Sequence, residues 1–233
     1  MSLESEISAR LSSVRARLIR AAAAAGRDPQ AIRLIAVSKT FPIEHVRAAA
    51  ATGQVDFGEN RVQEALDKIG QAGPLPVRWH LIGHLQANKA RKAAVSFSCI
   101  HSIDGLDLLR RVDRAASEAG TSTEAMVQVD LAGEPTKHGA LPEDLDAIFA
   151  AAGACQAVRV VGLMLLPPFF EDPEQTRPYF RRLRELREEL AARGVPSSML
   201  AQLSMGMSHD FEVAIAEGAT MVRVGTAIFG ERT

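Results

Sequence analysis

The chain has 233 residues, of which 47% are hydrophobic and 24% are charged, which is ordinary for one soluble domain with a sizeable core. Its formal net charge of -1 at pH 7 gives no reason to expect nucleic acid or an anionic membrane as a partner. No apolar run approaches the ~20 residues that a membrane-spanning helix needs.

The first segment of the chain has the spacing of an amphipathic helix. Apolar residues recur at three- and four-residue steps at Leu3, Ile7, Leu11, Val14 and Leu18. Gly26 and Pro29 are expected to end this helix. Its charges of both signs and its lack of an apolar signal core predict a cytoplasmic protein. Cys99 and Cys155 fit no disulfide or metal motif, so we expect two reduced core cysteines.

Short aliphatic or β-branched runs then alternate with helical stretches. The predicted strands are Ile32–Val37, Val55–Phe57, Trp79–Ile82, Ser98–Ile103, Ala125–Leu131, Val158–Leu165, Gln202–Met205 and Met221–Val224. The predicted helices include Ile43–Ala51, Arg61–Ile69, Ala87–Ser96, Leu106–Ala119, Pro142–Ala152, Glu174–Arg193 and Asp210–Ala216. Eight mostly apolar strands alternating with helices predict a parallel sheet that closes into a (β/α)8 TIM barrel. We expect residues 1–233 to form a single domain.

An open Rossmann-like or flavodoxin-like sheet is the competing architecture. A Rossmann sheet would carry a G-x-G-x-x-G motif directly after the first strand, where the dinucleotide pyrophosphate binds. In this chain the same position reads Ser38-Lys39-Thr40-Phe41-Pro42, without a glycine. No G-x-x-x-x-G-K-[ST] motif occurs either, so nucleotide binding of these two kinds is disfavoured.

Lys39 is the first candidate functional residue. Functional groups of such barrels gather at the carboxyl ends of the strands, and Lys39 follows the first predicted strand. Desolvation, or a nearby cation, disfavours the ammonium form and leaves an amine that can condense with an aldehyde. Taken alone, Lys39 is better explained as a lysine that reaches solvent, so the interpretation depends on its neighbours.

The loops after the last two strands are candidates for a phosphate site, as in many barrels of this kind. The seventh strand ends at Ser204 and continues through Gly206 to Ser208, where we expect the next helix to begin. A hydroxyl, a glycine and a helix N-terminus suit a phosphate dianion. Gly225 and Thr226, after the eighth strand, add backbone N–H groups and a second hydroxyl.

Arg223 is the second discriminating residue. It lies on the eighth strand, which in a closed barrel neighbours the strand that precedes Lys39. A guanidinium there would lower the pKa of Lys39 and could donate a hydrogen bond to the ring nitrogen of a pyridine cofactor. The alternative is a structural ion pair, for instance with Glu59 or Asp104.

Several long motifs in the right order carry a family resemblance. They are Ile35–Thr40, Phe57–Glu64, Trp79–Lys89, His101–Asp104, Leu203–Ser208 and Met221–Gly230. Along nearly its whole length the chain resembles the YggS/PROSC family of pyridoxal phosphate homeostasis proteins. The resemblance implies a barrel like the N-terminal domain of alanine racemase, with pyridoxal 5′-phosphate bound as a Schiff base (an internal aldimine) on Lys39. It implies further cofactor contacts, to the phosphate from Ser204, Gly225 and Thr226, to the ring nitrogen from Arg223, and near the phenolic oxygen from Asn60.

The resemblance also implies a role without catalysis. Members of the family are thought to carry or buffer the cofactor in vitamin B6 and amino-acid homeostasis, so PLP-dependent apo-enzymes are possible partners and no catalytic residue is assigned. Alanine racemases need a second domain and a partner tyrosine, whereas this chain ends after its eighth unit and has one tyrosine, Tyr179, on an outer helix. We therefore expect a monomer that is not an enzyme.

Three alternatives remain open. A PLP-dependent amino-acid racemase or lyase would use the same linkage, with His80, His84 or Asp130 as a proton donor. A metal-dependent hydrolase would use His80, His84, His101 and Asp104, although no H-x-H or H-E-x-x-H element is present. A pure interaction scaffold would leave the pairing of Lys39 with Arg223 unexplained.

Overall fold

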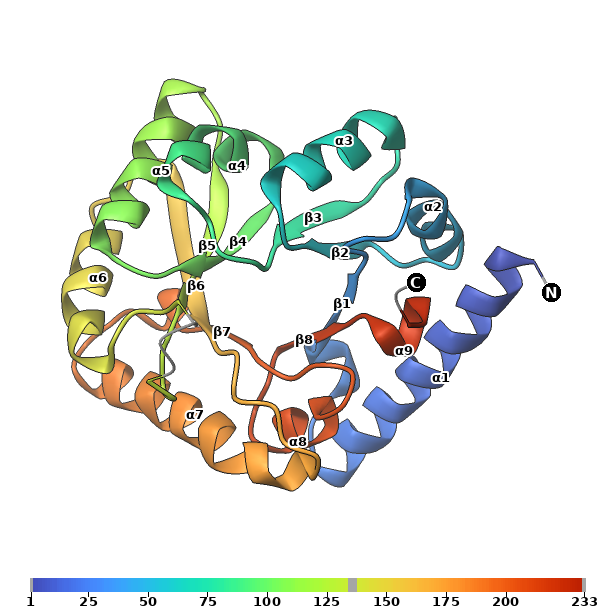
Figure 1. Cartoon of the computed structure of the whole chain (residues 1–233). Helices are drawn as coiled ribbons and strands as arrows, with labels where there is room; N and C mark the ends of the chain where they lie inside the picture. The colour runs from blue at the N-terminus through green and yellow to red at the C-terminus, as the bar shows by residue number, and fades with distance from the viewer. Residues whose placement is uncertain (1, 134–137, 232–233) are drawn as a thin grey trace.

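The computed structural model describes residues 2–133 and 138–231. Eight parallel strands follow one another around a closed barrel, with helices around the outside (Figure 1). The strands are β1 (Arg33–Val37), β2 (Asp56–Glu59), β3 (Arg78–Leu81), β4 (Cys99–Ile103), β5 (Thr123–Gln128), β6 (Val158–Met164), β7 (Gln202–Ser204) and β8 (Met221–Val224). The predicted (β/α)8 barrel is confirmed.

The α-helices that cover the barrel follow the strands in alternation. They are α1 (Leu3–Ala24), α2 (Ile43–Ala51), α3 (Val62–Ala72), α4 (Ala90–Ser96), α5 (Leu106–Glu118), α6 (Leu145–Ala152), α7 (Arg177–Ala192), α8 (Phe211–Ala216) and α9 (Thr226–Phe229). Single 3-10 turns are η1 (Pro29–Ala31), η2 (Ala87–Lys89), η3 (Pro142–Asp144), η4 (Pro173–Thr176) and η5 (Ser197–Met199). The turns η2, η3 and η4 open helices that were predicted as continuous. No helix in this described part of the chain is both long enough and apolar enough to cross a bilayer.

The N-terminal helix α1 packs against the barrel beside α2, α8 and α9 (Figure 1). Its first turn is capped because the Ser2 hydroxyl accepts a hydrogen bond from the Ser5 amide at 3.2 Å. Four of the five apolar positions predicted to face inward are buried, whereas Leu3 at the start of the helix is 38% exposed. Gly26, with a φ of 65°, ends the helix in the left-handed conformation that favours glycine.

The helix after β7 begins later than predicted. Residues 208–210 form a turn, and α8 begins at Phe211 instead of about Ser208. The Asp210 carboxylate accepts a hydrogen bond from the Met207 amide at 2.6 Å and closes this turn. The expectation of a helix N-terminus at Ser208 is therefore wrong.

The barrel has two apolar layers because alternate residues of each strand face opposite sides. Outward residues such as Ala36 and its register partner Phe57 pack under the helices. A separate cluster fills the inside of the barrel, with Ile35, Cys99, Met126, Val161, Met164 and Met221. Ile35 stands opposite Arg223 where β8 closes onto β1. Register partners face the same side of the sheet, so Arg223 lies inside the barrel as a polar side chain among these apolar ones.

Candidate functional site

A cavity of about 460 Å³ lies at the carboxyl ends of the strands. Five of the six residues predicted from the sequence to bind a cofactor line it, namely Lys39, Asn60, Arg223, Gly225 and Thr226. Among the lining residues that were not predicted to contact the cofactor are Gln128, His84, His138, Phe169, Ser208 and His209. The structure thus brings one amine, one guanidinium and two hydroxyls around a single space.

Lys39 lies in a tight turn directly after β1. The next residue, Thr40, has a φ of 69°, a left-handed conformation that is uncommon for residues other than glycine. The Thr40 amide donates a hydrogen bond to the Glu64 carboxylate of α3, which holds the turn in this conformation. Unusual backbone of this kind concentrates at functional sites, where the surrounding structure compensates for it.

A buried ionic network supports the same turn from below. The Lys68 ammonium donates hydrogen bonds of 2.8 Å to the Ser38 carbonyl, the Glu59 carboxylate and the Glu64 carboxylate. The Ser38 hydroxyl also donates to Glu59, at 2.7 Å. Burial raises the pKa of Glu59, although the hydrogen bond and the charge of Lys68 oppose this shift. The backbone on both sides of Lys39 is thus fixed by residues of β2 and α3.

Arg223 lies under the cavity on β8 and is 3% exposed. It donates one hydrogen bond to the Ser204 hydroxyl at 2.6 Å and another to the Leu165 carbonyl at 2.8 Å. Burial lowers the pKa of Arg223 to about 10, which still leaves the guanidinium charged at neutral pH. Arg223 therefore offers a fixed, charged donor to any ligand in the cavity.

The alternative ion pairs of Arg223 are not formed among the residues that the structure describes. Glu59 pairs with Lys68 at 2.8 Å, and Asp104 lies 3.3 Å from His84. The guanidinium instead donates to two neutral oxygen atoms, the Ser204 hydroxyl and the Leu165 carbonyl. The charge of Asp210 acts on Arg223 and opposes the effect of burial on its pKa, but no ion pair joins the two among the described residues, so the guanidinium can still donate to a ligand.

Of the six predicted cofactor contacts, Ser204 is the one that does not line the cavity. It is fully buried at the end of β7, its hydroxyl is bonded to Arg223, and it does not line the cavity. The cavity instead has Ser208, whose hydroxyl accepts a hydrogen bond from the Gly225 amide at 3.1 Å. Ser208 belongs to the same sequence motif, four residues beyond Ser204, and the sequence alone does not show which of the two hydroxyls lines the cavity.

Gly83 allows two loops of the cavity wall to meet. A Cβ atom on Gly83 would overlap the backbone oxygen of Asn60 and lie 2.9 Å from its Cα atom. Both contacts are with backbone, which cannot move aside as a flexible side chain can. The close approach of the β2–α3 and β3–η2 loops therefore requires glycine at residue 83.

We expect Gly83→Ala to lower the free energy of unfolding by about 1–3 kcal/mol, as overpacking against backbone does. Gly70→Ala is the matched control, because Gly70 lies in α3 and a Cβ atom there meets nothing within 4 Å. That control should gain about 0.5–1 kcal/mol through helix propensity. Urea denaturation of both variants measures the difference, and equal effects would contradict the close contact.

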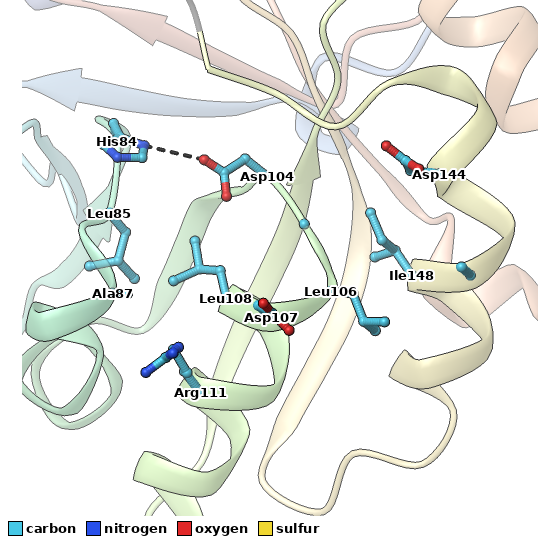
Figure 2. A pocket seen from close by; sticks show the side chains of 12 residues that line it. His84, Leu85, Ala87, Asp104, Leu106, Asp107, Leu108, Arg111, Asp144 and Ile148 are labelled. Atoms are coloured by element: carbon cyan, nitrogen blue, oxygen red, sulfur yellow. Dashed lines mark ion pairs between the residues drawn. The ribbon is translucent and has the colours of Figure 1, made fainter.

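A larger groove of about 740 Å³ lies beside the cavity and shares His84 with it (Figure 2). Its wall runs over the start of α5 and the side of α6, where Leu108, Asp107 and Ile148 line it. The groove has Arg111 but no lysine among its lining residues. Because a covalent aldehyde site needs an amine, the smaller cavity around Lys39 is the candidate site.

The four ligands of the hydrolase alternative do not gather in one place. His80 and His101 lie inside the barrel, whereas His84 and Asp104 lie at its mouth. At the mouth, the His84 and His138 rings stack with centroids 3.6 Å apart and planes 14° apart. A ring nitrogen's lone pair lies in the plane of its own ring, and two stacked, nearly parallel planes do not meet at one point, so these two rings do not suit one tetrahedral metal ion.

His101 makes folding stability depend on pH. Burial, the neighbouring His80 and the Arg223 charge lower the pKa of His101 well below its ordinary value. Below pH ~6.5 the unfolded chain takes up a proton that the folded protein does not, so stability falls as pH falls. Above that pH both states are neutral at His101 and the contribution is constant.

We therefore expect the stability difference between wild type and His101→Asn to shrink as the pH is lowered from 6.5 to 5. The limiting slope is about 1.4 kcal/mol per pH unit for one proton. Groups that do not contact His101 titrate alike in both proteins, so taking the difference removes their contribution. Urea denaturation at a series of pH values measures this, and a difference independent of pH would refute a neutral buried His101.

Comparison with known proteins gives the family. The model of the family described as "Alanine racemase, N-terminal domain" matches residues 10–233. The chain is 44% identical to a pyridoxal phosphate homeostasis protein of Aquifex aeolicus, over 96% of this chain and 97% of the relative. It is 43% identical to a protein of the same name from Pseudomonas aeruginosa, over 98% and 96% of the two chains.

A solved structure agrees with these relatives. PipY of Synechococcus elongatus, determined with PLP bound, superposes with a TM-score of 0.85 and 42% identity, over 96% of this chain and all of PipY. Family model, sequence relatives and structure cover nearly the same residues. The chain therefore belongs to the family of pyridoxal phosphate homeostasis proteins, which share the alanine racemase N-terminal domain.

Proposed function

We propose that this protein binds pyridoxal 5′-phosphate covalently on Lys39 and carries or buffers it in vitamin B6 and amino-acid homeostasis. One observation supports the proposal most strongly. Lys39, Arg223 and the Ser208–Gly225 contact all line one cavity of about 460 Å³. A volume of this size is typical of small-molecule sites.

The side chains around the cavity match the functional groups of the cofactor. Pyridoxal phosphate carries an aldehyde that an amine can capture, and Lys39 is the lysine in the lining. Arg223 is a permanently charged donor suited to the ring nitrogen. For the phosphoryl group we assign Ser208, Gly225 and Thr226, so Ser208 replaces Ser204 as the contacting hydroxyl. Asn60 is assigned to the phenolic oxygen.

The proposed role is storage and delivery without catalysis. A guanidinium at the ring nitrogen leaves that nitrogen unprotonated, which weakens the electron withdrawal that carbanion chemistry requires. Tyr179 lies on the outer helix α7 against Phe170, with ring centroids 6.0 Å apart, and is not among the lining residues. The names of the relatives, which refer to homeostasis, support the same role.

The remaining parts of the proposal follow from this role. We place the protein in the cytoplasm as a monomer, with residues 1–233 acting as one cofactor-binding domain. PLP-dependent apo-enzymes are the proposed recipients of the cofactor. Incubation with L- and D-amino acids in deuterated water tests the racemase or lyase alternative. Exchange or racemisation faster than with free cofactor would favour that alternative.

Ser208→Ala tests the phosphate assignment. We expect its affinity for pyridoxal phosphate to fall about tenfold, the size of one lost hydrogen bond to a charged group. Its affinity for pyridoxal, which lacks the phosphoryl group, should not change. Absorbance titration with both aldehydes measures this, with the exposed Ser12→Ala as the matched control. Equal losses for both ligands would refute the assignment of Ser208 to the phosphate.

A further inference from the structure

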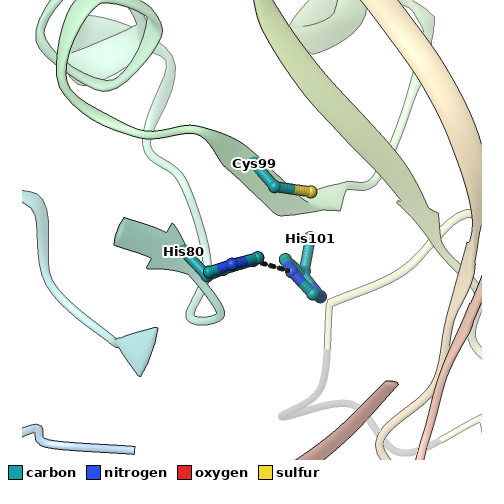
Figure 3. Close-up of side chains that lie close together, drawn as sticks. All are labelled: His80, Cys99 and His101. Carbon is teal, nitrogen blue, oxygen red and sulfur yellow. Dashed lines mark hydrogen bonds between the residues drawn. The ribbon is translucent and has the colours of Figure 1, made fainter. Parts of the chain in front are cut away.

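A continuous chain of polar side chains runs inside the barrel, away from the cavity. Arg223 donates to the Ser204 hydroxyl at 2.6 Å, and this hydroxyl lies 2.9 Å from Nδ1 of His101. Nε2 of His101 lies 3.0 Å from Nδ1 of His80 (Figure 3), and Nε2 of His80 lies 2.9 Å from the Asp56 carboxylate. All five side chains are buried and come from β8, β7, β4, β3 and β2.

The two ends of the chain fix the direction of the hydrogen bonds that Arg223 and Asp56 make. A guanidinium can only donate, and an ionised carboxylate can only accept. Burial acts to raise the pKa of Asp56, but hydrogen bonds from His80 and Arg78 and the charge of Arg78 hold it below its usual value. Asp56 is therefore ionised at neutral pH, and Arg223 is charged.

With both ends fixed, one arrangement of the groups between them keeps both imidazoles neutral. In this arrangement the Ser204 hydroxyl accepts from Arg223 and donates its own proton to Nδ1 of His101. His101 is then protonated on Nε2 and donates to Nδ1 of His80, which is protonated on Nε2 and donates to Asp56. Both imidazoles are neutral in this arrangement, and all the hydrogen bonds point from the cation to the anion.

The same residues do not form a metal site. The potential ligand atoms of His80, Cys99 and His101 all lie within 4.8 Å of one another (Figure 3). However, the two ring nitrogens that would face a metal ion are hydrogen-bonded to each other at 3.0 Å. Burial also raises the pKa of the Cys99 thiol, whereas a metal ligand must be a thiolate. The geometry is that of a hydrogen-bonded chain.

We propose that His101 and His80 are positioning residues that hold the Ser204 hydroxyl as an acceptor and thereby aim Arg223 at the cofactor cavity. Without His101, the Ser204 hydroxyl would lose the acceptor of its proton. The proton could then rotate toward the guanidinium and break the hydrogen bond from Arg223 to Ser204. Arg223 would then keep one anchor, the Leu165 carbonyl at 2.8 Å. The functional consequence rests on the proposed role of Arg223 at the ring nitrogen of the cofactor.

Nitrogen-15 NMR of the histidine rings in the wild-type protein tests the chain itself and requires no variant. The expected spectrum shows His80 and His101 both neutral and both protonated only on Nε2. A His101 protonated on Nδ1, or a His80 protonated on both nitrogens, would overturn the proposal. This result does not depend on whether the cofactor binds.

A pair of variants then tests the effect on the cofactor. We expect His101→Leu to weaken pyridoxal phosphate binding about tenfold, because one hydrogen bond to a charged group loses its support. His101→Asn should restore affinity to within about threefold of wild type, since its amide oxygen can take the place of Nδ1 and accept from Ser204. If His101 only supported the fold, His101→Leu and His101→Asn would weaken cofactor binding to a similar extent.

Ser204→Ala is the second route to the same test if His101→Leu fails to fold. It removes the acceptor of Arg223 directly and should weaken binding by a similar factor. If wild type binds the cofactor and both His101→Leu and Ser204→Ala bind it equally well, the positioning role is refuted. If wild type itself does not bind the cofactor, the proposed function fails, while the NMR result still decides the chain.

Discussion

Lys39→Ala is expected to purify as a colourless protein that loses added pyridoxal phosphate during desalting. The substitution removes the amine that lines the cavity but leaves Arg223, Ser208 and Gly225 in place. Without a covalent bond, the remaining contacts give reversible binding only. The visible absorbance of the protein before and after desalting measures the effect, which we expect to be complete loss of retained colour.

The fold of the Lys39→Ala variant should be preserved. The backbone of its turn is held through Thr40 and Ser38 by Glu64 and Lys68. Far-UV circular dichroism checks this. Lys92→Ala serves as the matched control, because Lys92 is an exposed lysine on α4 and should retain colour as wild type does. Retention of colour by Lys39→Ala would show that another amine holds the cofactor.

Lys68→Met is expected to lower the free energy of unfolding by about 3–5 kcal/mol, as removal of one partner of a buried ion pair does. The Lys68 side chain is 8% exposed and bonds to Glu59, which is fully buried. The substitution leaves the Glu59 carboxylate without its cation and also removes the hydrogen bond to the Ser38 carbonyl. Urea denaturation monitored by circular dichroism measures the loss.

A double variant and a control variant identify the cause of that loss of stability. Adding Glu59→Gln to Lys68→Met removes the uncompensated charge and should recover about 1–2 kcal/mol, a coupling typical of residues in contact. Lys92→Met, at the exposed site, should change stability by less than about 0.5 kcal/mol. If Lys68→Met were no more destabilising than Lys92→Met, the network would not support the turn at Lys39.

The general placement of Lys39 and Arg223 could be predicted from the sequence. Each predicted strand is present in the structure, and β8 has the predicted bounds. Strand order in a closed barrel places the eighth strand beside the first, and the observed register sets Arg223 opposite Ile35. Placing these two residues required only the strand positions and the closure of the barrel, which hydrophobic periodicity indicates.

The identity of the serine hydroxyl that lines the cavity could not be predicted in the same way. Ser204 and Ser208 stand in one motif, and their roles depend on where β7 stops and α8 starts. The strand ends with Ser204 directed into the barrel toward Arg223, and the turn before Phe211 places Ser208 at the cavity. Strand and helix bounds are the least certain part of any interpretation from sequence.

The buried contacts of Lys68 with Glu59 and of His80 with His101 could not be predicted from the sequence either. Glu64 and Lys68 are four residues apart on α3, a spacing usual for exposed ion pairs, and nothing in it indicates that Lys68 turns inward to Glu59. His80 and His101 were considered only as metal ligands or proton donors, because the same residue types serve several purposes. Their mutual hydrogen bond depends on the side-chain geometry inside the closed barrel.

The central claim is that the amine of Lys39 holds the cofactor in this cavity. Borohydride reduction of the wild-type protein with pyridoxal phosphate, followed by proteolysis and mass spectrometry, tests it most directly. The predicted result is one stoichiometric pyridoxyl modification, located on Lys39. Labelling spread over surface lysines such as Lys89 and Lys92, with Lys39 unmodified, would contradict it.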